Sequence, residues 1–220
     1  GEDAMRIEIG PQKPEHFKTY WDGQYDLFSH FEYACGIPSA LFMITTLKEN
    51  GKPNACFGAW SSFTGDAGGY YAVIGGLNKN SHTWQNIQRT GEFIINFVSN
   101  DYYEHCIATI GRNGADEDEI VAGGFTEESA KTVGCPRIAE AFLCLECKLE
   151  KQVDLSGSAQ LIIGKVGHIA MQEAYAGSLD AKYGESGFMF NIHAPKDLRT
   201  DEGKPSAVAV CKIVRINEEG

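Results

Sequence analysis

The stretch from Asn54 to Val98 constrains the fold of this chain more than any other. It holds three runs rich in β-forming residues, at 54–64, 70–76 and 92–98, and one short helical segment before the last run. The segment Ala67-Gly68-Gly69 marks a chain reversal between the first two runs. The stretch therefore predicts antiparallel strands with a single helix packed among them.

The helical segment has a clear start. Ser81 is a good N-cap residue, and Trp84 and Ile87 follow three residues apart, as on a helix that packs one face inward. The first turn offers free backbone N–H groups, the hydroxyl of Thr83 and, just upstream, the charge of Lys79, which together can seat a phosphate. An ordinary capped surface helix explains the same residues, and spacing alone favours that interpretation.

Further strand-like runs and turns extend the β-structure along the chain. Six or seven strands with few helices between them indicate an antiparallel sheet closed into a barrel with helical additions. The hairpin turns are expected at 49–52 and 155–157, and the further strands at 39–48, 142–154, 158–169 and 207–216.

A chain of 220 residues fits one domain with insertions. We expect a single barrel domain over residues 39–216, with a polar and helical insertion around 101–141. The aromatic-rich segment 1–38 has no clean period and is expected to wrap the outside of the core. The acidic cluster 116–119 is interpreted as a solvated face.

Charge and composition narrow the partners. The formal net charge of −11 and the lack of any basic run argue against nucleic acid as a partner. No stretch reaches the length of a membrane span, and the first residues lack the form of a signal peptide. Seven cysteines, an odd number in apolar surroundings, indicate reduced thiols in a cytoplasmic protein.

Cys144 and Cys147 have the spacing of a redox or metal pair. They lie in an alternating strand pattern, however, in which an offset of three puts the two sulfur atoms on opposite faces, one apolar and one polar. No second cysteine pair and no nearby histidine completes a zinc site. We therefore predict no metal and no dithiol role.

Nucleotide-binding fingerprints are absent, since the chain has no Walker A loop, no Gly-x-Gly-x-x-Gly and no Gly-x-Ser-x-Gly. His82 lies inside the proposed anion-binding turn, where it could donate a hydrogen bond or simply face solvent. Asn54 and the run 59–63, with small residues and hydroxyls beside Trp60, would let backbone amides approach a flat heterocycle. A plain strand with a core tryptophan explains that run equally well.

Taken together, these pieces resemble the flavin reductase-like family, the FMN-binding split barrels that are also called flavoredoxin-like. The ordered combination covers about half of the chain. Its parts are the hairpin 41–54, the run 59–63, the segments 79–87 and 90–96, and the run 161–166.

The resemblance implies a mainly β, six-stranded Greek-key split barrel that forms a homodimer, with FMN rather than FAD near the subunit interface. The phosphate would be held by Lys79, Ser81 and Thr83, with Asn80 and His82 as neighbours. The isoalloxazine would lie along Asn54, Ala59, Trp60, Ser61 and Ser62.

The resemblance also implies a reaction in which NAD(P)H delivers hydride to the flavin, which passes electrons to free flavin or a partner protein. The flavin carries the chemistry, so no side chain is named as catalytic. One departure matters: many members have Gly-Asp-His in the hairpin where this chain has Ser156-Gly-Ser158. This keeps open a flavoredoxin-type carrier reduced by a partner protein, and a barrel that binds no flavin and serves as a binding module.

Overall fold

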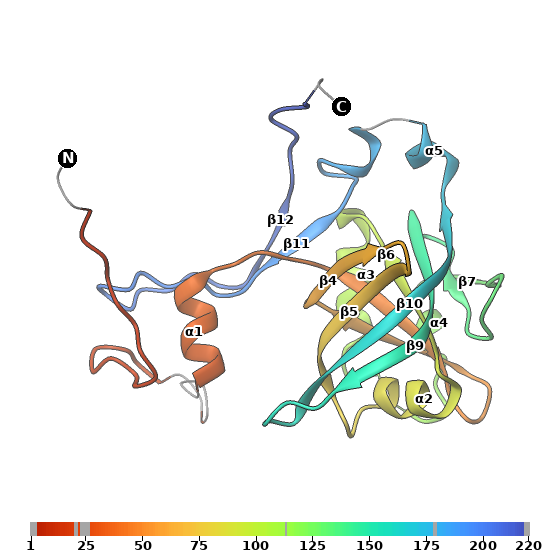
Figure 1. Ribbon diagram of the computed structural model, residues 1–220, viewed down its shortest axis with the longest axis horizontal. Coiled ribbons are helices and arrows are strands. Elements are labelled where there is room, and N and C mark those ends of the chain that lie inside the picture. Colours follow the sequence, from red (N-terminus) through yellow and green to blue (C-terminus); the bar gives the residue numbers. More distant parts are fainter. Residues whose placement is uncertain (1–3, 20–21, 23–26, 113, 178–179, 218–220) are drawn as a thin grey trace. The chain divides into compact units, whose positions relative to one another are not determined.

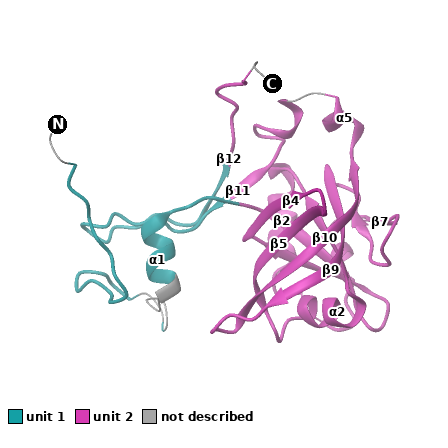
Figure 2. Ribbon diagram, viewed as in Figure 1, with its two compact units in different colours: residues 1–39, 191–209 teal, residues 40–190, 210–220 magenta. Residues whose placement is uncertain are grey.

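The computed structural model describes residues 4–19, 22, 27–112, 114–177 and 180–217. The chain divides into two compact units (Figure 2). Residues 1–39 and 191–209 form the smaller unit, and residues 40–190 with 210–220 form the larger one. The predicted boundary after residue 38 lies beside this division, but residues 191–209 group with the N-terminal segment. The wrapping role of that segment stays a prediction.

One seven-stranded antiparallel sheet forms the larger unit (Figure 1). The strand order is β3-β2-β6-β9-β10-β5-β4. The strands are β2 (Phe42–Leu47), β3 (Pro53–Gly58), β4 (Ser61–Asp66), β5 (Gly69–Asn78), β6 (Glu92–Phe97), β9 (Leu143–Val153) and β10 (Ala159–Met171).

The connection between β3 and β4 closes this sheet. These strands lie at opposite edges of the sheet, yet β3 ends at Gly58 and β4 begins at Ser61. A chain spans at most about 3.6 Å per residue, so the short link through Ala59 and Trp60 brings the two edges together. The predicted antiparallel split barrel with added helices is confirmed.

The barrel interior is one apolar cluster. Inward residues alternate along each strand, as with Ala72 and Ile74 on β5 and Phe93 and Ile95 on β6, and all four are at most 1% exposed. Gly164 on β10 faces the Phe93 ring so closely that a Cβ atom there would lie 2.3 Å from it. Position 164 of β10 therefore requires glycine, because any side chain there would clash with the Phe93 ring in the core.

Short helices and strands complete the chain, and none of the described helices is long and apolar enough to span a membrane. The longest in the barrel unit is α2 (His82–Thr90). The other helices are α1 (Leu27–Cys35), α3 (Tyr103–Thr109), α4 (Glu119–Ala122), α5 (Glu173–Ala176) and the 3₁₀ turns η1 (Asn100–Tyr102) and η2 (Asp180–Lys182). The short strands are β1 (Ser39–Ala40), β7 (Glu127–Glu128), β8 (Arg137–Ile138), β11 (Met189–Ile192) and β12 (Ala207–Val210). The strand predicted at 207–216 thus ends six residues early.

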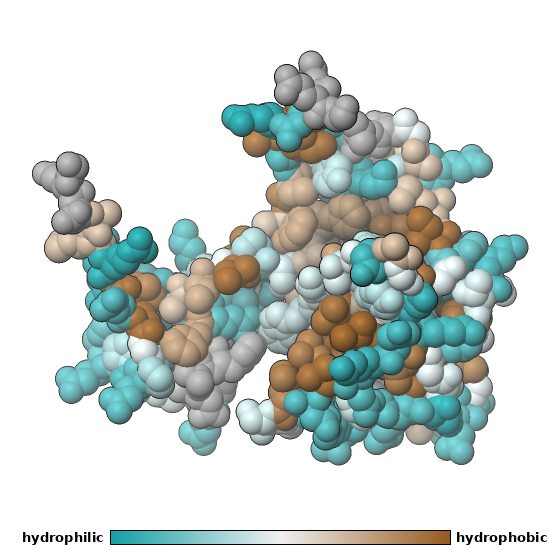
Figure 3. All heavy atoms as spheres, viewed as in Figure 1, coloured by the Kyte–Doolittle hydropathy of each residue, from teal (hydrophilic) through white to brown (hydrophobic). Residues whose placement is uncertain are grey.

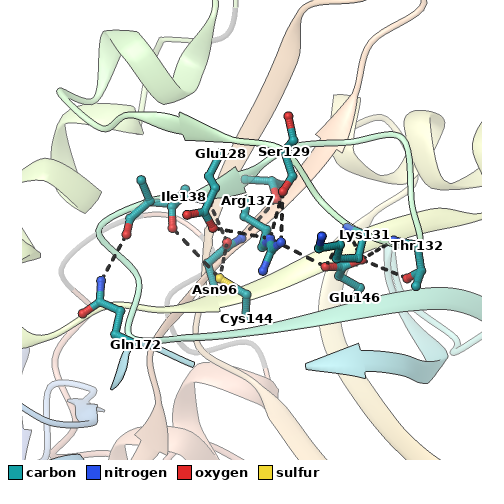
Figure 4. A network of polar contacts seen from close by, with 12 residues as sticks. Asn96, Glu128, Ser129, Lys131, Thr132, Arg137, Ile138, Cys144, Glu146 and Gln172 are labelled. Atoms are coloured by element: carbon teal, nitrogen blue, oxygen red, sulfur yellow. Dashed lines mark hydrogen bonds and ion pairs between the residues drawn. The ribbon is translucent and has the colours of Figure 1, made fainter. Parts of the chain in front are cut away.

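Glu146 on β9 anchors the predicted insertion to the barrel (Figure 4). Its buried carboxylate accepts hydrogen bonds from the N–H groups of Lys131 at 2.9 Å and Thr132 at 2.6 Å, and Nε of Arg137 lies 3.6 Å away. Burial alone would raise the pKa of Glu146, but these hydrogen bonds and the guanidinium charge outweigh it and lower the pKa. The carboxylate is therefore charged in the folded protein.

This anchor corrects one expectation. The strand 142–154 was predicted to turn one polar face to solvent, yet Cys144 and Glu146 on that face are 3% and 0% exposed. The polar face reaches solvent at Lys148 and Glu150. The prediction is wrong over the first half of the strand because the insertion covers it.

A buried ion pair holds the smaller unit together. Nζ of Lys196 lies 2.6 Å from Oδ1 of Asp201 and within 6 Å of the ring centres of Phe17 and Tyr33, at 5.5 and 5.9 Å. The second carboxylate oxygen of Asp201 accepts a hydrogen bond from the N–H of Lys18 at 2.6 Å. Residues 196–201 thereby fix the fold of the N-terminal segment.

Candidate functional site

A pocket of ≈ 320 Å³ lies where the first turn of α2 faces β3. One wall is β3 and another is the first turn of α2. The end of α3 and the start of α4 complete it. The lining residues are Asn54, Ala55, Cys56, Phe57, His82, Thr83, Thr109, Ile110, Gly111 and Glu119.

Ser81 begins α2 as predicted. Its backbone is extended, with φ −76° and ψ 152°, and its Oγ accepts a hydrogen bond from the N–H of Trp84 at 3.1 Å. The same hydroxyl donates to the carbonyl of Asn78 at 2.7 Å. The Ser81 hydroxyl therefore serves the cap, and its remaining lone pair offers a ligand an acceptor rather than a donor.

Asn54, Thr83 and Glu119 form a buried chain of polar groups, and they are 2%, 2% and 1% exposed. With the Asn54 amide turned so that its NH₂ faces the carboxylate, it donates to both oxygens of Glu119 at 3.0 and 3.1 Å and accepts from the Thr83 hydroxyl at 3.0 Å. The opposite orientation would press the amide oxygen against the carboxylate. The carboxylate therefore sets the direction of this hydrogen-bond chain.

Glu119 is held from two more sides. The N–H of Ala55 donates to its Oε2 at 2.9 Å, and Nζ of Lys48 lies 3.2 Å from its Oε1. The pKa of Glu119 is raised, because the effect of burial exceeds that of the hydrogen bonds from Ala55 and Lys48 and of the Lys48 charge, which lower it. The predicted solvated face at 116–119 is thus wrong for Glu119, since a folded helix turn carries it into the barrel wall.

Lys79 and Asn80 do not line this pocket. Nζ of Lys79 lies 3.4 Å from Oδ1 of Asp154 in an exposed ion pair. The N–H of Asn80 donates to the side chain of Asn78 in the turn before α2. Their assignment to the phosphate stays a prediction.

The segment 59–62 does not line the pocket either. Trp60 is 38% exposed, and its ring lies over Gly76, where a Cβ atom would be 2.5 Å from it. Gly76 has φ +74°, so glycine is required there for both reasons. Ser61 and Ser62 pair with Ile74 and Val73 of β5, and Ser62 is exposed. Contact of Ala59 and these three residues with a flavin stays a prediction.

The structure thus brings together three of the ten predicted binding residues, Asn54, His82 and Thr83, in one pocket. Sequence reasoning missed the other seven lining residues, which are Ala55, Cys56 and Phe57 on β3, Thr109, Ile110 and Gly111 at the end of α3, and Glu119. Asp118 is a favourable N-cap residue that could have indicated the start of α4, where its side chain accepts hydrogen bonds from the N–H groups of Ile120 and Val121.

The cysteines offer no reactive pair. Cys147 lies in the barrel core, while Cys144 lies on the opposite face of β9 with its Sγ 3.4 Å from Oδ1 of Asn96, as predicted for an offset of three. Burial raises the pKa of both thiols to about 12. Within the described residues, no group of three or more His, Cys, Asp or Glu side chains is placed to hold a metal ion.

Comparison with known proteins decides the family. The model of the flavin reductase like domain matches residues 34–186, which include the whole barrel sheet. The chain belongs to the flavin reductase-like family. The resemblance inferred from the sequence is confirmed, and the family is one of flavin-binding proteins.

Solved structures agree on the fold of this flavin reductase-like chain. A protein assigned as a flavin reductase with a split barrel domain, from Shewanella frigidimarina NCIMB 400, superposes with a TM-score of 0.68 at 21% identity, covering 86% of this chain and 90% of that one. Flavoredoxin of Desulfovibrio vulgaris (Miyazaki F) gives a TM-score of 0.61 at 19% identity, covering 83% and 91%. At this level of identity the likeness shows the fold.

Among curated relatives, an uncharacterized protein of Aquifex aeolicus (strain VF5) is 38% identical over 71 residues, which is 32% of this chain and 36% of that protein. An uncharacterized protein of Halalkalibacterium halodurans is 27% identical over 51% of this chain. The match spans less than two thirds of either relative, 36% and 63% of their lengths.

Proposed function

We propose that this chain is a flavin-dependent oxidoreductase that binds FMN in the pocket between β3 and α2 and passes electrons from NAD(P)H to free flavin or a partner protein. One observation carries the proposal: the pocket lies at the first turn of α2, beside Asn54 and Thr83, in a member of the flavin reductase-like family. A bound flavin supplies the acceptance and release of two electrons.

The residues of the pocket suit this ligand. The first-turn N–H groups of His82 and Thr83 have no partner within the helix by geometry and point out of its start. Ile110 and Phe57 supply apolar surface, and Gly111 permits close approach of backbone. The chain would therefore orient the flavin, while no side chain is required to act as an acid or a base.

The test is an anaerobic absorbance titration of the purified, flavin-loaded protein with NADH and then NADPH. Prompt bleaching of the flavin band with either nucleotide is the expected result. If the protein retains no flavin after incubation with excess FMN, the proposal is wrong.

A second candidate function is an electron carrier reduced by another protein. The hairpin between β9 and β10 has Ser156-Gly-Ser158 in an exposed turn, where a Gly-Asp-His sequence is common in the family. A chain without that histidine could depend on a protein donor. A flavin band that only dithionite bleaches would favour this carrier.

We also propose a homodimer, formed through an apolar strip on the outside of the barrel. Val73 of β5 pairs with Ile163 of β10, and Gly75 lies between the side chains of Leu161 and Trp60, each 3.6 Å from a Cβ atom built there. Figure 3 shows apolar spheres interrupting the hydrophilic surface over β5 and β10. A second copy would remove this strip from water.

Sedimentation velocity tests this interface. Ile163→Glu is expected to give monomers, whereas Ile107→Glu, at an exposed apolar residue on α3, should leave the dimer intact. A monomeric parent chain at micromolar concentration would contradict the dimer.

A cytoplasmic location is also part of the proposal. The free state of all seven cysteines suits a reducing compartment.

A further inference from the structure

A second pocket, of ≈ 420 Å³, opens at the end of the barrel opposite α2, and we call it the end pocket. Tyr70 lies at the start of β5, which leads to α2, and Phe97 is the last residue of β6, which leads away from α2. Tyr70 and Asn78, at the far end of β5, are therefore separated by roughly 25 Å of strand. In Figure 1, α2 lies at one end of the sheet and α5, which follows β10, at the other. The lining residues are Ala40, Phe63, Tyr70, Phe97, Leu143, Leu145, Ile169, Met171, Phe188 and Phe190.

The end pocket is a hole into the barrel interior rather than a flat surface. Phe97 and Leu145 are both 4% exposed and belong to the apolar cluster of the barrel, so they form the floor. Tyr70 and Ile169, at 48% and 55% exposure, form the rim. A flat surface laid on the rim would leave empty apolar space below it, which is destabilising, whereas a small inserted molecule would fill that space.

One wall of the end pocket is held in place by the main chain. The N–H of Phe188 donates to the carbonyl of Lys182, and the N–H of Leu41 donates to the carbonyl of Met189, each at 2.9 Å. The ring centres of Phe188 and Phe97 lie 5.2 Å apart, with the rings at 81°. The wall is thus formed before a ligand arrives, so binding does not have to order it.

The lining of the end pocket disfavours charge. Among its ten lining residues none carries a charged side chain, and the Tyr70 hydroxyl is the single polar side-chain group. A charged ligand would lose its hydration there without gaining a partner. The phosphates of FMN and of a nicotinamide nucleotide therefore do not suit this pocket.

The same lining favours a ring. Five of the lining residues are aromatic and Met171 adds a thioether, and both kinds of group pack well against the faces and edges of aromatic ligands. The volume lies within the range of small-molecule sites, roughly 300–1,000 Å³.

We propose that the end pocket is a second ligand site, which takes an uncharged aromatic small molecule. This site goes beyond the proposed function and does not depend on it. Among the described residues, none lines both the end pocket and the candidate flavin pocket.

Isothermal titration calorimetry of the full chain with 2-naphthol tests the site. The matched ligand control is 2-naphthoate, which has the same rings and a carboxylate. We expect saturable binding of 2-naphthol, tighter than that of 2-naphthoate by about tenfold or more. Ile169→Glu places a charge at the exposed rim and should weaken 2-naphthol binding by about tenfold. Val121→Glu, at a residue of α4 that is 60% exposed, is the matched control and should leave the affinity unchanged.

Ala40→Phe gives a second arm inside the end pocket. The added ring occupies part of the space and should weaken 2-naphthol binding by about tenfold or more, while circular dichroism checks that the fold is kept. If this variant does not fold, the comparison of Ile169→Glu with Val121→Glu decides.

Several results would overturn the inference. They are no saturable binding of 2-naphthol by the parent, equal affinity for 2-naphthoate, and equal effects of Ile169→Glu and Val121→Glu. Displacement of 2-naphthol by excess FMN would place the probe in the flavin pocket and overturn it too. A shift from dimer to monomer on adding 2-naphthol, read by sedimentation velocity, would assign the end pocket to a second copy of the chain instead. Failure to bind FMN overturns the proposed function alone.

Discussion

The Oγ atom of Ser81 and the backbone nitrogen of Trp84 lie 3.1 Å apart, and this hydrogen bond fixes where α2 begins. The cap directs the first turn of the helix at β3, and it lets Trp84 and Ile87 enter the barrel core at 6% and 0% exposure. The position of the candidate flavin pocket follows from this bond.

Ser81→Ala is expected to lower the free energy of unfolding by about 1 kcal/mol, because one N-terminal amide of the helix loses its acceptor. Ser81→Gly should cost a few tenths of a kcal/mol, roughly, since glycine also tolerates the cap position. Urea denaturation measures both. Equal losses for the two variants would show that the Oγ contact does not stabilise the helix.

Lys48→Met should destabilise the fold strongly. The substitution leaves the Glu119 carboxylate buried without its cation, which typically costs about 3–5 kcal/mol. Lys79→Met is the matched control, because its ion pair with Asp154 is 50% and 69% exposed and should contribute less than about 1 kcal/mol. Similar unfolding free energies for the two variants would contradict the burial described for Lys48.

Glu146 should make stability fall in acid. Its pKa is lowered in the folded protein, so the unfolded chain binds the proton more readily, and stability is present above the unfolded pKa and lost as pH falls through the folded one. Glu146→Gln should reduce stability at neutral pH and flatten this dependence. Thermal unfolding followed across the acid range checks it, with Glu150→Gln, an exposed residue of the same strand, as the control.

The buried thiols should be unreactive. Burial raises the pKa of Cys144 and of Cys147 to about 12, so the thiolate is scarce at neutral pH and shielded as well. Maleimide labelling of the native protein, read by peptide mass spectrometry, should modify the exposed Cys35 first. Cys144→Ser should leave flavin content and turnover nearly intact, and a large loss would restore a role for the pair.

Much of the barrel could be predicted because its determinants are local. Alternating strand residues, the Gly51 turn with φ +83° and the Ser81 cap each act within a few residues along the chain. The resemblance then supplied the closure of the sheet. Sequence patterns of this kind report which residues can form a hairpin or a helix end.

The two buried carboxylates could not be predicted in this way. Glu119 belongs to an acidic cluster and Glu146 lies on the polar side of an alternating strand pattern, and both patterns are typical of exposed carboxylates. Their partners come from distant segments, Lys48 and Ala55 for the first and Arg137 for the second. Burial of a charge depends on such three-dimensional pairing, so the composition of the pocket became visible with the fold.

The division of the chain has a consequence for the order of folding during synthesis. The smaller unit is assembled from residues 1–39 and 191–209, and the Lys196–Asp201 pair that meets Phe17 belongs to the second of these segments. Residues 40–190 leave the ribosome before that segment, so the barrel can close while the first 39 residues still lack their partners. The segment 1–39 is therefore made before the barrel strands but meets its partner segment only after them.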